Sequence, residues 1–96
     1  MKLIKIHALD TNKYEAEEYL QAINAEKVSN ITCVTEKAGD DTEYFGIEFV
    51  SASWITFVEL DSKFKDEKWF MKLLNKLSDS LKKENVVDFD KLVSEL

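Results

Sequence analysis

The sequence predicts an α+β fold in the order β-α-β-β-β-α-α, with an antiparallel meander packed against helices. Several short stretches alternate apolar and polar residues with a period of two, which is typical of strands. Three other stretches repeat apolar residues at i, i+3, i+4 and i+7, which is typical of amphipathic helices. Because the 96 residues contain no linker or low-complexity segment, we expect one domain spanning residues 1–96.

The first third of the chain predicts a strand followed by a helix. Residues 2–9 alternate as a strand, whose core face consists of Ile4, Ile6 and Ala8. A helix is expected over residues 13–25, with Asn12 as its N-cap and Glu15 completing a capping box. Its buried stripe would be Ala16, Tyr19, Leu20 and Ile23.

The middle third predicts the meander. Strands are expected over residues 28–36, 43–50 and 54–60, separated by turn-forming residues at 38–42 and 51–53. The last of these strands is apolar on both faces, which indicates a central strand or one covered by a helix.

The last third predicts two helices. The longer, over residues 66–83, has acids in its first turn and lysines in its last turn, which complements the helix dipole. Its buried stripe is Phe70, Leu73, Leu74, Leu77 and Leu81, expected to meet Phe45, Ile47, Phe49 and Phe57 of the meander. Asp88 is expected to cap a short C-terminal helix.

Composition predicts a small acidic cytoplasmic protein. The formal net charge is −6, and residues 10–61 alone carry −9, whereas residues 62–83 carry +4. No stretch approaches 18 apolar residues and the N-terminus lacks a cleavable leader pattern, so we expect a soluble protein with no membrane partner. The lone Cys33 excludes a disulfide within the chain and favours a reducing compartment.

The residues that usually carry catalysis are scarce. His7 is the only histidine, and a Cys–His pair would need both side chains on the same face of neighbouring strands. His7 shares its face with Leu3 and Lys5, whereas Cys33 shares its face with Ile31, so such a pair is not predicted. With two glycines in all, the sequence has no phosphate-binding loop, and the acids at 40–43 lack the pattern of a calcium loop. We therefore expect no enzyme activity, no cofactor and no metal.

Acidic residues form the first candidate binding surface. A negative surface can imitate the spacing of phosphates and occupy a basic groove on a partner, including a nucleic-acid-binding protein. This predicts a non-enzymatic binding protein that regulates or inhibits a larger macromolecule. The ordinary alternative is that these charges serve solubility alone. The candidate residues are Glu15, Glu17, Glu18, Asp40, Asp41 and Glu43.

Lysines of the long helix form the alternative surface, which would contact RNA. Lys65, Lys68, Lys72 and Lys76 fall on one helical stripe, and Trp69 lies beside it. Lysines can contact phosphates while an aromatic ring stacks on a base. The ordinary alternative is a solvent-facing helix surface, and the chain has no arginine for bidentate recognition. If neither charged surface is used, Tyr44, Trp54 and the C-terminal helix would remain as an apolar docking surface.

Part of the middle of the chain resembles the small PrgU-type regulators carried by conjugative plasmids of Gram-positive bacteria. The resemblance rests on Val34-Thr35-Glu36-Lys37, Asp41 to Gly46 and Ser53-Trp54-Ile55-Thr56-Phe57. It implies an RNA-linked cytosolic regulator with a PUA-like β-rich body. In size, acidity and element order the chain is also similar to anti-CRISPR proteins of phages and plasmids. Both resemblances imply a protein of a mobile genetic element.

Overall fold

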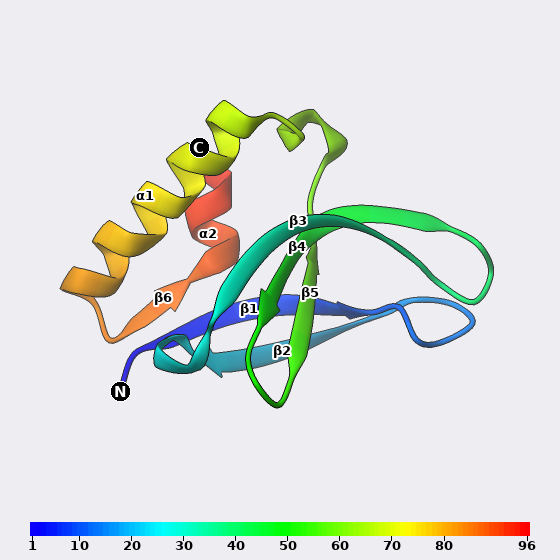
Figure 1. Cartoon of the computed structure of the whole chain (residues 1–96), viewed down its shortest axis with the longest axis horizontal. Helices are drawn as coiled ribbons and strands as arrows, with labels where there is room; N and C mark the ends of the chain where they lie inside the picture. The colour runs from blue at the N-terminus through cyan, green and yellow to red at the C-terminus, as the bar shows by residue number, and fades with distance from the viewer.

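The computed structural model describes residues 1–96, except for the side chain of Lys63, and contains two three-stranded sheets and two α-helices (Figure 1). The strands are β1 (Leu3–Asp10), β2 (Glu17–Asn24), β3 (Asn30–Lys37), β4 (Glu43–Val50), β5 (Ile55–Glu59) and β6 (Val86–Asp88). The helices are α1 (Glu67–Lys83) and α2 (Phe89–Ser94), and two short 3-10 turns are η1 (Ala25–Lys27) and η2 (Ser62–Phe64). The predicted α+β class is confirmed.

Each sheet has a simple order. In the first, β1 lies between β2, which is antiparallel to it, and β6, which is parallel. In the second, β3, β4 and β5 form the predicted antiparallel meander. The predicted strand 2–9 is confirmed as β1, but it lies in the first sheet and does not join the meander.

The predicted helix over residues 13–25 is wrong, and with it the order β-α-β-β-β-α-α. Residues 17–24 form β2, which pairs with β1 along its whole length, from Leu3 opposite Asn24 to Asp10 opposite Glu17. Of the predicted helical stripe, Ile23 is buried, whereas Tyr19 and Leu20 are 41% and 60% exposed. Pairing with a neighbouring strand overrides the weak local preference for a helix.

The C-terminal third follows the predicted pattern closely. Asp66 caps α1, its side chain accepting a hydrogen bond from the Trp69 N–H at 2.9 Å. Asp88 caps α2 in the same way, accepting from the Lys91 N–H at 3.2 Å. Strand β6 was not predicted, because three residues are too few to display a period. This short strand nevertheless fixes the C-terminal segment beside β1.

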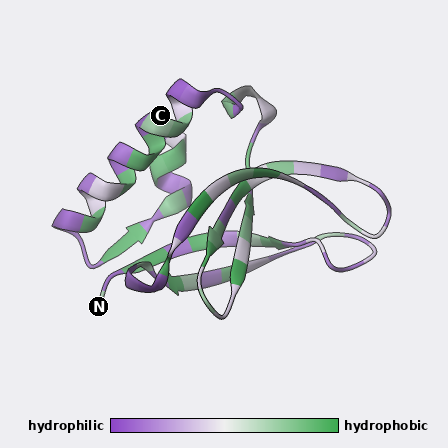
Figure 2. Cartoon of the chain, viewed as in Figure 1, coloured by the Kyte–Doolittle hydropathy of each residue, from purple (hydrophilic) through white to green (hydrophobic). Residues whose placement is uncertain are grey.

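The core lies where the two sheets face each other and where α1 and α2 cover one end, and Figure 2 shows hydrophobic colour along these strands. Ile47 and Phe49 share this core with Leu73 and Leu77, as predicted. The Phe49 ring packs edge-on against Phe89, with centroids 5.2 Å apart. The remaining members of the buried cluster are Ile4, Ile6, Ala8, Ile23, Val58, Val87 and Leu92.

Other predicted core contacts lie elsewhere. Phe45 lies under the Lys65 ammonium, 5.1 Å from its ring centroid, and Leu74 is only half-buried. Strand β5 is at the edge of its sheet and so is not central, yet Thr56, Phe57 and Val58 are all buried. Strand β5 lies against β1 of the other sheet, whereas on its opposite face the buried Phe57 is flanked by Ile55 and Glu59, which are exposed.

Candidate functional site

Two loops meet at the end of the molecule opposite the helices (Figure 1). They are the loop between β1 and β2 and the loop between β3 and β4. The Gly39 N–H donates to the Lys13 carbonyl at 2.9 Å, and the Asp40 N–H donates to the Tyr14 carbonyl at 2.8 Å. A Cβ atom on Gly39 would lie 2.7 Å from the Tyr14 Cα, so this close approach requires glycine. Backbone contacts therefore hold the two loops together.

These contacts bring the predicted acidic residues to one end of the molecule, which we call the acidic end. Three of its residues lie in the joined loops, and three lie at the starts of strands β2 and β4. All six side chains are exposed. The acidic end consists of Glu15, Glu17, Glu18, Asp40, Asp41 and Glu43. Residues separated by up to 28 positions in the sequence thus lie at the same end of the fold, although Glu17 and Glu18, as consecutive strand residues, point to opposite faces of β2.

Few cations lie among these acids. Lys13 Nζ is 2.7 Å from a Glu17 carboxylate oxygen, and this hydrogen bond raises the pKa of Lys13. Lys37 Nζ is 3.7 Å from Glu43. Both pairs are exposed and screened by solvent, so they contribute little to stability. The acidic end therefore keeps a net negative charge available to a partner.

More carboxylates lie beside the acidic end, outside the six candidate residues. Burial raises the pKa of Glu48, and a hydrogen bond and like charge from Glu36 raise it further. Burial also raises the pKa of Glu59, with a contribution from Glu18. Strands β2 to β5 thus place carboxylates close enough to disfavour their ionisation.

An open cleft of about 220 Å³ lies between the end of the first hairpin and the second sheet. Its polar lining includes the carboxyl groups of Asp10, Glu36 and Glu48. The apolar part of its lining is Leu9, Tyr19, Ile55 and Phe57. A cleft with this lining can accommodate the apolar stem and the charged head of a lysine or arginine side chain.

Strand alternation shows which residues of one strand share a face, and together with the strand register it could have grouped these additional acids. Pairing of Gly46 with Val34 and with Glu59 places Glu36, Glu48 and Glu59 on one face of the second sheet. Alternation with a period of two finds this face once the strand register is known. The register itself depends on contacts between distant residues.

The predicted lysine stripe is less accessible than the acidic end. Lys65 lies over Phe45, and Lys76 Nζ is 3.1 Å from Glu95. The Trp69 ring stacks on Phe64 at a centroid distance of 4.7 Å, and its Nε1 atom is shielded from solvent. Lys68 and Lys72 remain exposed. The aromatic ring expected to stack on a base is therefore already packed against another ring of this chain.

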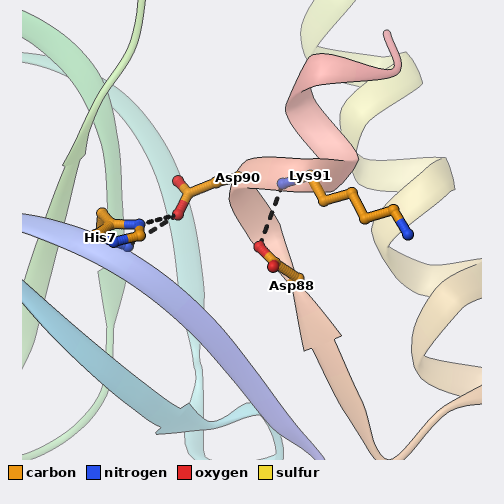
Figure 3. Close-up of polar contacts among 4 residues, drawn as sticks. All are labelled: His7, Asp88, Asp90 and Lys91. Carbon is orange, nitrogen blue, oxygen red and sulfur yellow. Dashed lines mark hydrogen bonds and ion pairs between the residues drawn. The ribbon is translucent and has the colours of Figure 1, made fainter.

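The single histidine forms a different pair from the one considered in the sequence. His7 Nδ1 is 2.5 Å from Asp90 Oδ2, which also accepts a hydrogen bond from the His7 backbone N–H (Figure 3). This pair ties α2 to β1, while Cys33 lies on the other sheet. Within the described part of the chain, no group of three or more histidine, cysteine or carboxylate side chains is arranged to hold a metal ion.

The two aromatic residues of the apolar docking hypothesis are both half-buried. Trp54 packs against the core, and Tyr44 lies in β4 opposite Glu36. Neither is among the most exposed apolar residues, so this hypothesis has less structural support than the acidic end.

The described residues contain no helix that is long and apolar enough to cross a membrane. No family model matches the chain, and neither a curated protein nor a solved structure matches it. The function must therefore be inferred from the surface of this chain itself. The fold defines a small α+β domain with two β-sheets and one strongly acidic end.

Proposed function

We propose that this chain is a non-enzymatic binding protein whose acidic end docks on a basic surface of a larger macromolecule and thereby inhibits or regulates it. One observation carries the proposal. The hydrogen bonds from Gly39 to Lys13 and from Asp40 to Tyr14 join two acidic loops, so their charges act together. A surface made in this way presents several carboxylates to one partner at the same time.

The proposed partner is a protein that normally binds nucleic acid, acting in the cytoplasm. Such a protein has a groove lined by lysine and arginine that attracts regularly spaced negative charges. Exposed carboxylates attract that groove over a distance of about 8–10 Å at physiological ionic strength. This is the mode of action expected of an anti-CRISPR or another anti-defence protein of a phage or plasmid.

The cleft beside the acidic end adds a specific contact to this proposal. Asp10, Glu36 and Glu48 would receive one lysine or arginine side chain of the partner. A bound cation favours the ionised form of Glu48, whose pKa is raised in the free protein. Binding would therefore release a proton and become tighter as the pH rises through that pKa.

The alternative function, an RNA-binding regulator of the PrgU or PUA-like kind, would use the lysine stripe. Lys68 and Lys72 are exposed and separated by one helical turn, so both could contact a phosphate backbone. The stacking of Trp69 on Phe64 counts against base stacking at this site. We therefore rank this function second.

A capture experiment with two charge-reversal variants distinguishes the functions. The tagged chain is used to capture partners from a host lysate, with and without nuclease treatment. A triple change of Glu15, Glu17 and Glu18 to lysine should abolish capture of a protein that survives nuclease, and added salt should weaken capture by the unmodified chain. The matched control, Lys68→Glu with Lys72→Glu, should leave that capture intact.

The opposite result contradicts the proposal. If the double lysine variant loses its partner and the triple glutamate variant keeps it, the helix carries the function. Co-purified RNA that nuclease removes would then identify the alternative. Circular dichroism of each variant checks that the fold is retained, as expected for exposed substitutions, which usually change stability by about 0.5 kcal/mol or less.

A further inference from the structure

The outer edge of β3 is the least protected strand edge of the fold. Its eight residues pair with β4 without a bulge, and no other strand of the described chain pairs with its second edge. The other strand edges are shorter or carry charged residues that discourage pairing. Strand β6 has three residues and β5 has five, whereas β2 begins with two glutamates. Natural proteins usually protect long edges with charge, proline or bulges.

The hydrogen-bonding groups on this edge can be assigned from the ladder. The Leu60 N–H donates to the Phe45 carbonyl, so odd-numbered residues of β4 direct their backbone groups toward β5. Even-numbered residues of β4 therefore face β3, and Val34 lies opposite Gly46. It follows that odd-numbered residues of β3 direct their N–H and C=O groups to the open edge. These residues are Ile31, Cys33, Thr35 and Lys37.

An apolar groove runs beside the same edge. Ile31 and Cys33 lie opposite Phe49 and Ile47, so their side chains are on the core face of the sheet. Helix α1 lies on that side and leaves a groove of about 360 Å³. The apolar groove is lined by Ile31, Leu74, Leu77 and Leu81, with Ser78 and Lys82 at its rim. A strand added to β3 would therefore cover this groove with its own core-facing residues.

We infer that the occupant of this edge is a second copy of the chain, paired antiparallel through β3. Residues 30–35 are uncharged, so the strand can lie beside its own copy with no like charges directly opposite each other. A twofold axis perpendicular to the sheet joins the two meanders into one sheet and keeps their core faces on one side. Each copy of α1 then lies on that side, and the two apolar grooves close against each other.

The net charge opposes association of two copies, and the antiparallel arrangement keeps this repulsion small. Each copy carries a net charge of −6, and the acidic end lies beyond the C-terminal end of β3. Antiparallel pairing directs the two acidic ends to opposite ends of the dimer, where their repulsion is weakest. The dimer therefore leaves both acidic ends free for partners.

In the favoured register, Cys33 of one copy lies directly opposite Cys33 of the other, which we call centring on Cys33. In this register Ile31 faces Thr35 of the second copy, and Lys37 extends past the groove to face Ser29. A shift of the second copy that centres the pairing on Val34 would place Lys37 opposite Ile31, with its charge over the apolar groove. Centring on Cys33 avoids that cost and places the two Cys33 Cα atoms about 5.5 Å apart. This separation is within the range of about 4.4–6.8 Å that a disulfide spans.

The first test measures mass in solution. Sedimentation of the unmodified chain, from low-micromolar to sub-millimolar concentration under reducing conditions, should show a mass rising from 11.1 kDa toward twice that value. Thr35→Pro removes an N–H that points to the open edge and leaves the β4 ladder intact. It should raise the dimer dissociation constant at least about tenfold, or about 1.4 kcal/mol. The matched control Thr35→Val keeps the N–H and should dimerise like the unmodified chain.

The second test measures the register and needs no proline. Mild oxidation of the unmodified chain should give a covalent dimer through Cys33. Moving the thiol two residues, with Cys33→Ser and Thr35→Cys together, places the two sulfur-bearing residues about 14 Å apart along the paired strands. This variant should form at least about tenfold less covalent dimer at the same concentration.

Two results would overturn the inference. One is a mass of 11.1 kDa at every concentration together with equal oxidation of the two cysteine variants. The other is a dimer that forms equally well with Thr35→Pro, which would put the interface elsewhere. If Thr35→Pro fails to fold by circular dichroism, Leu81→Lys in the apolar groove takes its place and must weaken the dimer. Added salt should strengthen this dimer, since the two copies carry like charge.

Discussion

The helical end and the acidic end of this molecule are held together in different ways. At the helical end, α1, β6 and α2 are fixed by buried side chains such as Leu73, Val87 and Phe89. At the acidic end, two loops are joined by backbone hydrogen bonds, while their side chains remain exposed. Backbone hydrogen bonds can thus position a surface without burying the side chains that form it. It also predicts that mutations at the two ends have different consequences.

The largest effect should come from the helical end. Leu73 is fully buried, so Leu73→Ala should lower the free energy of unfolding by about 2–5 kcal/mol. Leu74 is half-buried beside the apolar groove, so Leu74→Ala should cost about half as much or less. Urea unfolding at low protein concentration measures both. Equal losses for the two variants would show that the assigned face of α1 is wrong.

A smaller, local effect should come from the contact between the loops. Gly39→Ala places a Cβ 2.7 Å from the Tyr14 Cα and should cost about 1–3 kcal/mol through steric conflict. Hydrogen exchange at the Asp40 amide should accelerate more than exchange in α1. Asp41→Gly is the control, because Asp41 has a φ of 65° that glycine adopts freely. Equal acceleration of exchange at both ends would show that the contact between the loops does not act locally.

The contact between His7 and Asp90 should have a still smaller effect. His7→Ala removes the side-chain contact but keeps the backbone N–H that donates to Asp90 at 3.2 Å. Because both side chains are largely exposed, the loss should be about 1 kcal/mol or less. Asp90→Ala removes both hydrogen bonds and should destabilise the chain more. Thermal unfolding of the two variants tests this order, and the reverse order would contradict it.

The smallest effect should come from the carboxyl pair beside the acidic end, and it should depend on pH. A raised pKa in the folded state means that the contribution of Glu48 is favourable below its ordinary value of 4.5 and is lost as the pH rises through the raised value. Glu48→Gln removes the ionisable carboxyl group, so the stability at this position no longer falls as the pH rises. Its melting temperature should exceed that of the unmodified chain at pH 7, and the difference should shrink below pH 4.5.

The same Glu-to-Gln change at an exposed position is the matched control for Glu48→Gln. Glu26 is exposed in η1, so Glu26→Gln should leave the melting temperature almost unchanged at both pH values. If Glu48→Gln behaves like Glu26→Gln, repulsion between Glu36 and Glu48 has no effect on stability.

The sequence predicted the structure of the helical end better than that of the acidic end. Helices are specified by residues close together in the sequence, whereas strand pairing depends on residues far apart. Helix α1 has its cap at Asp66, its apolar stripe and its terminal charges all within residues 66–83. These are local signals, because helix hydrogen bonds join residues four positions apart. The fold brings the loops and strand ends that carry the six candidate acidic residues to one end of the molecule, although the helix assigned to three of them was wrong. Their carboxyl neighbours Glu36, Glu48 and Glu59 required the strand register.

Local sequence patterns were sufficient to predict the α+β class, the meander, α1, the cap of α2 and the excess of acid between residues 10 and 61. Long-range contacts were needed to show that residues 17–24 form a strand, that β6 joins β1, and that the two acidic loops touch. A strand acquires its hydrogen bonds from residues far away in the chain, so its own sequence does not specify its partner. The acidic end exists because Gly39 lets one loop approach the backbone of the other, and that contact depends on the whole fold.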